Sequence, residues 1–129
     1  MSVLNEFIEL FASTAEANCN LESEISLEEL KHENSLYAEI GHGFNESEYF
    51  NRASVHVVPV LVLARNMDQF KCLEQLESIC NYYSKLKSYP NGESFAWMTT
   101  EVTKQLGRIG QDADGMYHYS CILNNKLYY

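Results

Sequence analysis

Basic residues are scarce in this chain, and their scarcity limits what it can bind. Nine Lys and Arg stand against 18 Asp and Glu, which gives a formal net charge of −9. A field of this sign repels phosphate backbones and anionic lipid headgroups, so DNA, RNA and membrane surfaces are disfavoured as partners. The same field suits a protein that pairs with basic protein surfaces or lets nucleic acid pass without binding it.

Long apolar stretches and processing signals are lacking too. The longest apolar stretch, 57–64, is far shorter than the roughly 18 residues of a membrane-spanning helix. No basic segment followed by an apolar one stands near the start, so we expect no secretory leader and no membrane partner. The cysteines are widely spread and form no C-x-x-C pair, which favours reduced core residues of an intracellular protein. They are Cys19, Cys72, Cys80 and Cys121.

Motifs that carry chemistry are missing as well. The chain has neither a G-x-S-x-G elbow nor an S-x-x-K pair, and its glycines lack the spacing of a phosphate-binding loop. No two of its histidines stand at helical or H-x-H spacing, as metal ligands on one element would. These histidines are His32, His42, His56 and His118. We therefore expect no enzyme activity, no catalytic residue, no bound metal and no cofactor.

What the chain does have is enough apolar material for one core. It contains 129 residues, of which 46% are hydrophobic, and this is the size at which a single domain folds by itself. We find no internal repeat, no low-complexity tract and no linker rich in Gly, Ser or Pro. The sequence predicts one domain over residues 1–129.

Hydrophobic periodicity predicts the order of the elements. Helical spacing indicates a helix over 3–15, with Ser2 as its cap, and a second helix capped by Asn66 or Asp68 that ends before Pro90. Alternation and β-branched content indicate strands at 21–27, 36–40, 54–65, 94–106 and 116–129. For 21–27 a short helix with a capping box at Ser26 is the alternative. The expected fold is a two-layer α+β domain, in the order α-β-β-β-α-β-β, with a mainly antiparallel sheet and both helices on one face.

The predicted strand 54–65 is apolar on both sides. Leu61 and Leu63 face one way together with two valines nearer the start, and three further valines face the other way. One side can be covered by the helices of the chain, whereas the other needs a second layer, such as a neighbouring subunit. Tyrosine is enriched at protein interfaces, so alternating tyrosines in the last strand are candidates as well. The predicted interface residues are Val58, Val60, Val62, Tyr117, Tyr119 and Tyr129. Pro59 lacks an N–H, which predicts a bulge or an edge position at this point.

Two polar features have competing interpretations. The glutamates before residue 30 form either a solvated face or a functional acidic surface that lines a pore or mimics nucleic acid. The four candidates are Glu22, Glu24, Glu28 and Glu29. The D-x-D-G sequence that begins at Asp112 is similar to a calcium loop, but an apolar strand follows where the distal glutamate ligand should stand. We therefore predict a hairpin turn there.

The order and spacing of two segments resemble the tail terminator proteins of tailed bacteriophages, which are also called tail completion or minor capsid proteins. The first segment is A-S-V-H-V-V-P-V-L-V-L-A at 53–64, which leads into the helix that follows Met67. The second is R-I-G-Q-D-A-D-G-M-Y-H-Y at 108–119, which leads into the last strand. The resemblance covers most of the chain. Pro59 and the segment 21–33 depart from the pattern and leave the local strand order open.

The resemblance implies a structural role in the virion. Members of the family form a hexameric ring at the head-proximal end of the tail, where they end polymerisation of the tube and provide the surface that joins the head. Expected partners are further copies of the chain, the major tail tube protein and a head-completion or neck protein, with assembly in the host cytoplasm. DNA would pass through the ring without specific binding.

Two other classes of function remain open. An acidic DNA mimic would inhibit a nucleic-acid-binding protein by presenting carboxylates in place of phosphates, as a monomer or dimer. A small enzyme would bring catalytic residues together only in space, around His56 or His118, and should have a deep pocket.

Overall fold

A computed structural model describes residues 2–30, 33–41, 44–48 and 54–129, with side chains described for all of these except 44–48, 104–106 and 108. Over these residues the chain forms two helices and a mixed, mostly antiparallel sheet of six strands. The elements are α1 (Val3–Asn18), β1 (Ile25–Ser26), β2 (Ser35–Ile40), β3 (Phe44–Glu48), β4 (Ser54–Asn66), α2 (Gln69–Lys85), β5 (Ala96–Gln111) and β6 (Tyr117–Tyr128). The predicted α+β class is confirmed.

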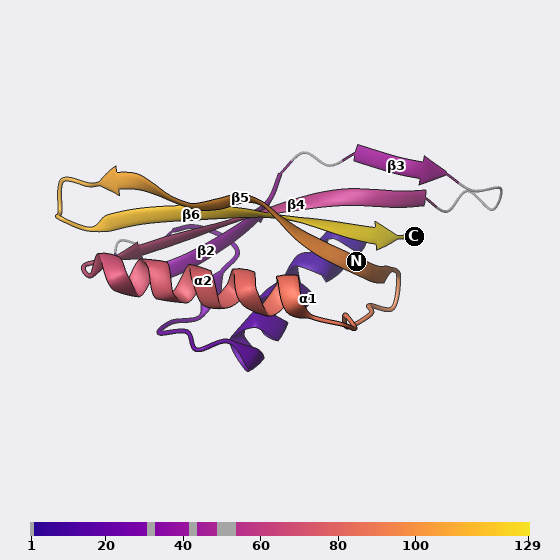
Figure 1. The fold of residues 1–129 in the computed structure, drawn as a ribbon, viewed down its shortest axis with the longest axis horizontal. Helices are drawn as coiled ribbons and strands as arrows, with labels where there is room; N and C mark the ends of the chain where they lie inside the picture. Colours follow the sequence, from indigo (N-terminus) through magenta and orange to yellow (C-terminus); the bar gives the residue numbers. More distant parts are fainter. Residues whose placement is uncertain (1, 31–32, 42–43, 49–53) are drawn as a thin grey trace.

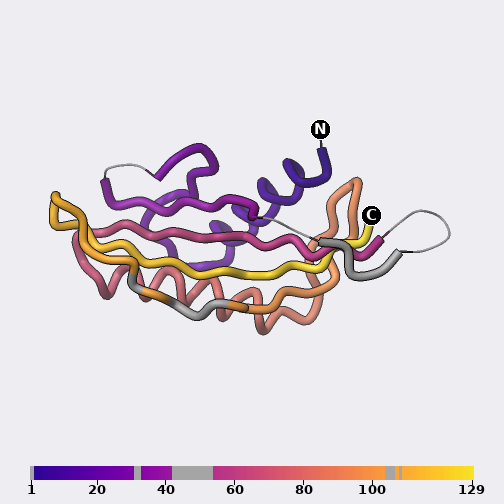
Figure 2. Tube along the Cα trace, turned by 90° about the horizontal axis from the view of Figure 1, so that it is seen from above, coloured from indigo at the N-terminus to yellow at the C-terminus, as the bar shows by residue number. Residues whose placement is uncertain are grey.

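The sheet has the strand order β1-β2-β4-β6-β5, and β3 pairs with the first part of β4. All of these pairs are antiparallel except the two-residue pairing of β1 with β2. Figures 1 and 2 show both helices on the same side of the sheet, with α1 near β2 and α2 along β5 and β6. The domain therefore has two layers, with its core between the helices and one face of the sheet.

Both helices begin where their capping residues predict. The Ser2 hydroxyl accepts a hydrogen bond from the Asn5 amide at 3.1 Å, and an Asp68 carboxylate oxygen accepts one from the Phe70 amide at 2.9 Å. Asp68 rather than Asn66 is thus the cap of α2. Phe70 is 69% exposed, because it lies in the first turn of α2, outside the contact with the sheet.

Aromatic rings fill the space between α1, α2 and β5. The Phe11 ring stacks on Tyr83 of α2 with centroids 4.5 Å apart, and Phe7 meets the Trp97 indole edge to face at 4.9 Å. The buried Tyr83 hydroxyl donates to the Phe11 carbonyl at 2.6 Å, which satisfies its polar end. These contacts fix the two helices to each other and to the sheet.

The strand boundaries differ from the predictions in three places. The strand expected at 21–27 is reduced to Ile25–Ser26, and the alternative helix does not form. Most of β3 lies in the polar stretch 45–51, for which alternation predicts no strand. It pairs with β4, and residues 49–51 of this stretch lie outside the described part. β5 continues to Gln111, well past Leu106, because pairing with β6 extends it through several register shifts.

Pro59 lies in a central strand, so the predicted bulge or edge position is wrong. β4 pairs with β6 without a register shift, and Pro59 stands opposite Asn124. On its other side, β4 pairs with β3 over residues 54–57 and with β2 over residues 60–65. The Pro59 carbonyl accepts from the Gly41 amide at 2.9 Å, so its nitrogen faces the same side, where β2 gives way to β3. The missing N–H therefore falls where no strand would pair with it.

Candidate assembly surface

The helix-facing side of β4 is covered by the chain itself. Val58 is 3% exposed, and Val60 and Val62 are fully buried in the core below the helices. These valines were predicted to form a contact between subunits, and this prediction is wrong. The alternation assigned them correctly to one face of the strand, but it carried no information on which face the helices would cover.

Tyr117 and Tyr119 of β6, and Tyr129 just after it, lie on that same face. Tyr119 is 6% exposed and belongs to the core, and its hydroxyl lies 3.4 Å from Gln69 Oε1 on α2. Tyr119 therefore cannot supply an interface, contrary to the prediction. Tyr117 and Tyr129 are partly buried at opposite ends of the strand, and the Tyr129 ring stacks on the His56 ring with centroids 3.8 Å apart. A role of these two in subunit contact remains a prediction.

The other face of the sheet carries an apolar centre, which we call the open face. It consists of Tyr37 on β2, Leu61 and Leu63 on β4, and Ile122 on β6. Leu61 stands directly opposite Ile122, and Leu63 directly opposite Tyr37, so the four side chains adjoin across three strands. All four are partly exposed, and neither helix lies over this face (Figure 1). On this side of β4, Leu61 and Leu63 are thus only partly covered, whereas Val55 and Val57, nearer the start of the strand, are buried.

Polar side chains surround the open face. Glu39 stands opposite Leu61 and accepts a hydrogen bond from the Tyr37 hydroxyl at 2.9 Å. Asn124 and Lys126 continue the same face along β6, and Glu101 stands opposite Asn124 on β5. An apolar centre with a polar rim is the usual composition of a protein–protein contact.

An ion cluster, formed by Arg65, Asp112 and His118, closes one end of the open face. Arg65 at the end of β4 is 4% exposed and stands opposite His118 of β6. Asp112, in the turn between β5 and β6, accepts from Arg65 Nη2 at 2.7 Å and from Nε at 2.9 Å, and lies 2.8 Å from His118 Nε2. The charge of a nearly buried guanidinium is thereby paired within the chain.

The same carboxylate shapes the hairpin turn. Asp112 Oδ1 accepts from the backbone amides of Asp114 and Met116 at 2.9 and 3.1 Å, while Gly115 adopts a left-handed backbone with φ of 83°. The predicted hairpin turn is confirmed, and hydrogen bonds to the Asp112 side chain close it. The sequence did not predict the ion cluster; its only signal was an arginine at the end of an otherwise apolar strand.

The acid stability of the domain should depend on Asp112. The His118 ring and then the Arg65 guanidinium hold the pKa of this carboxyl well below its usual range. A carboxylate with a lowered folded-state pKa stabilises the fold fully above its unfolded pKa, about 4, and loses this contribution as the pH falls through the folded pKa. Asp112→Asn should therefore be less stable than the parent near neutral pH, and the difference should shrink below about pH 4.

Denaturant unfolding over a pH series measures this difference. Asp114→Asn is the matched control, because Asp114 lies 3.5 Å from the same guanidinium but is 76% exposed. Its difference from the parent should be small at every pH. A gap between Asp112→Asn and the parent that stays constant down to about pH 2 would contradict the assigned role of Asp112.

No known protein family matches the chain, and no curated protein does.

The four predicted acidic residues lie in the connection between α1 and β2, and all four are exposed. Glu22 is partly engaged by the fold, since its carboxylate accepts from Asn66 Nδ2 at 3.2 Å and its amide donates to Gln75 Oε1 at 2.9 Å. The amides of Glu28 and Glu29 both donate to the Ser26 hydroxyl at 3.4 Å. The segment thus presents its carboxylates to solvent from a hydrogen-bonded backbone, beside the β1 edge of the sheet.

The two candidate histidines that the structure describes, His56 and His118, have separate partners. His56 stacks on Tyr129, His118 belongs to the ion cluster, and His32 and His42 lie outside the described residues. Within the described part of the chain, no three His, Cys, Asp or Glu side chains are grouped to hold a metal ion. Among the same residues, neither helix has the length and apolar character needed to cross a membrane.

Proposed function

We propose that this chain is a structural virion protein that forms a hexameric ring on the end of a bacteriophage tail tube. The ring ends polymerisation of the tube and offers the surface that joins the head. Its partners are further copies of the chain, the major tail tube protein and a head-completion or neck protein. The residues that act in this role make contacts and carry out no bond chemistry.

The open face is the observation that carries this proposal. Tyr37, Leu61, Leu63 and Ile122 form a contiguous apolar centre on a sheet whose helices all lie on the opposite side. Apolar groups that a domain leaves in water favour association, at roughly 25 cal/mol for each Å² that a partner removes from solvent. A closed ring supplies such a partner to every subunit in the same geometry.

The charge distribution supports passage of DNA through such a ring. The net charge is −9, and the acidic connection carries Glu22, Glu24, Glu28 and Glu29 on its surface. Carboxylates around a lumen repel phosphates, so DNA would move through the opening without adhering to it.

The oligomeric state of the purified protein tests the proposal. Size-exclusion chromatography with light scattering, followed by negative-stain imaging, should find closed rings of about six subunits, either for the chain alone or after addition of tube protein. A particle that remains monomeric at high concentration and does not bind tube protein would contradict the ring. Inhibition of a nucleic-acid-binding protein by that monomer would instead support the DNA-mimic alternative.

A further inference from the structure

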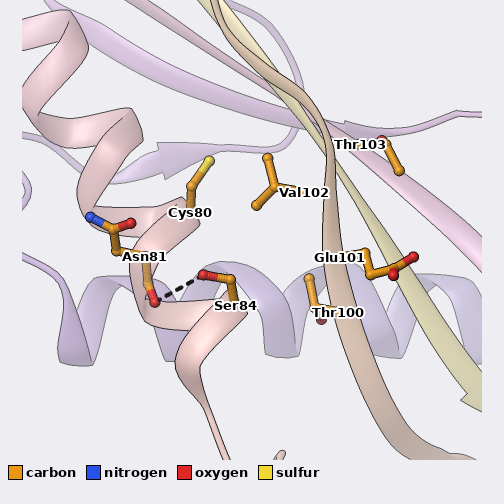
Figure 3. Close-up of a pocket in the computed structure, with 7 residues that line it drawn as sticks. All are labelled: Cys80, Asn81, Ser84, Thr100, Glu101, Val102 and Thr103. Carbon is orange, nitrogen blue, oxygen red and sulfur yellow. Dashed lines mark hydrogen bonds between the residues drawn. The ribbon is translucent and has the colours of Figure 1, made fainter.

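The strand β5 forms one edge of the sheet, and part of this edge lies beside a groove. β5 pairs with β6 on one side and, among the described residues, with no strand on the other. The groove lies between this edge and α2 and has a volume of about 490 Å³. It is lined by residues 100–103 of β5 and by Cys80, Asn81 and Ser84 of α2. Figure 3 shows the Val102 side chain directed toward α2 and the Glu101 side chain directed away from it.

The backbone beside the groove has hydrogen-bonding groups that point away from the sheet. The Thr100 amide donates to the Tyr89 hydroxyl at 3.2 Å, so this amide faces away from β6. Residues 99–102 pair with β6 without a register shift, and backbone groups alternate between the two sides of a strand. The amide and the carbonyl of Val102 therefore face the outer side as well. Within the described part of the chain neither has a partner there, so both can pair with an added strand.

The edge on either side of Val102 is closed to such pairing. Before it, side chains from the loop between α2 and β5 occupy the outward amides: Asn91 Oδ1 accepts from the Trp97 amide at 3.0 Å, and the Tyr89 hydroxyl accepts from Thr100. After it, the register with β6 shifts repeatedly, beginning between Val102 and Lys104. Capping groups and bulges of this kind are how sheets protect their edges. The opening in the protected edge thus coincides with the groove.

The charges beside the groove are acidic. Glu101 is exposed and stands opposite Asn124, on the open-face side of β5. Glu77 is exposed and lies one turn before Asn81, on the face of α2 that lines the groove. None of the lining side chains is basic, and the net charge of the chain is −9. An approaching segment that carries lysine or arginine is attracted here, whereas a second copy of this acidic chain is repelled.

We propose that the edge at Val102 binds a basic, extended segment of a partner protein, which adds to the sheet as a strand beside β5. Side chains of such a segment alternate between two sides. Those on the α2 side enter the groove beside Val102 and are small and apolar, and those on the other side are lysine or arginine and lie beside Glu101. Hydrogen bonds to the Val102 backbone supply affinity, while the groove and Glu101 supply specificity.

A synthetic peptide tests the charge preference. The probe is a fluorescently labelled peptide of about eight alternating lysine and valine residues with blocked ends. Its fluorescence anisotropy should show saturable binding to the native chain, whereas the same peptide with glutamate in place of lysine should not bind. Glu101→Lys should weaken binding of the lysine peptide roughly tenfold. Equal binding of the two peptides, or no binding of either, would overturn the proposal.

A pair of N-methylated peptides tests strand addition itself. One is methylated on the valine nitrogens and the other on the lysine nitrogens, so the two have the same composition and charge. Only one set of amides faces β5 in an added strand, because successive amides point to opposite edges. One of the two peptides should therefore bind like the parent peptide and the other should not. Equal affinities would show that the peptide is held by charge alone and would contradict an added strand.

Val102→Pro makes the same test on the protein. Proline lacks the N–H, and an edge strand tolerates it where that N–H faces outward, so the domain should stay folded while peptide binding falls roughly tenfold or more. Val102→Ala keeps the N–H and is the matched control. Unchanged binding to a folded Val102→Pro would overturn the proposal. If circular dichroism shows that this variant unfolds, the methylated peptides still decide the question.

The peptide site does not depend on the proposed ring. Leu61→Lys alters the open face and leaves the outer edge of β5 intact, so this variant should bind the lysine peptide with the affinity of the parent. A failure of ring formation and a failure of strand addition can therefore be told apart. Loss of peptide binding by Leu61→Lys would show that the peptide binds the open face instead.

Discussion

Replacement of Val62 by aspartate should unfold the domain. The side chain is fully buried, with Ala38 of β2 on one side and Cys121 of β6 on the other. A carboxylate at this position would lose its hydration without gaining a partner, at a cost of several kcal/mol. Domains are stable by only about 5–15 kcal/mol in total, so most or all of the fold should be lost. Far-UV circular dichroism and urea unfolding measure this loss.

Val62→Ala is the matched control for size. It removes two methyl groups without introducing charge, so the domain should stay folded with a loss on the order of 2 kcal/mol. If Val62→Asp unfolded at the same urea concentration as the parent, Val62 could not lie in the core as described.

Replacement of Leu61 by lysine should leave the domain folded but prevent the proposed ring from forming. Leu61 is adjacent to Val62 but lies on the open face, opposite Glu39, whose charge a lysine would complement. The charge would have to be desolvated whenever a second subunit covered the face, which should weaken the contact roughly a hundredfold or more. Light scattering should then find monomers whose circular dichroism matches that of the parent.

The control for this substitution is Phe70→Lys. Phe70 is 69% exposed in the first turn of α2, on the side of the sheet that bears the helices. This variant tests whether the loss of any exposed apolar side chain disrupts assembly. Because Phe70 lies outside the open face, rings should still form. Intact rings from Leu61→Lys would show that the open face is not the subunit contact, while leaving the fold assignment unaffected.

Local chemistry explains which elements could be predicted. The caps at Ser2 and Asp68 depend on residues only two or three positions away, as does the Asp112 turn. The alternation of β4 likewise depends only on the period of an extended chain. The strand β3 could not be predicted in this way, because its sequence is polar without alternation and only its pairing with β4 defines it as a strand.

The candidate surfaces could likewise be predicted only in part from the sequence. Alternation separated Val60 and Val62 from Leu61 and Leu63, but both sets are apolar, and hydrophobicity does not say which set will meet the helices. The predicted interface was therefore placed on the covered side. The four exposed glutamates were easier to predict, since charged side chains remain in water almost wherever the chain takes them.

The sequence by itself determined the class of fold, the order of the helices and of all strands except β3, the acidic charge and the existence of a doubly apolar strand, because each depends on composition or on short-range periodicity. Only the tertiary structure decided which part of β4 remains open, why Pro59 is tolerated in a central strand, and that Arg65 meets Asp112. These are contacts between segments distant in sequence. They are set by how the helices pack on the sheet, and no local pattern encodes that choice.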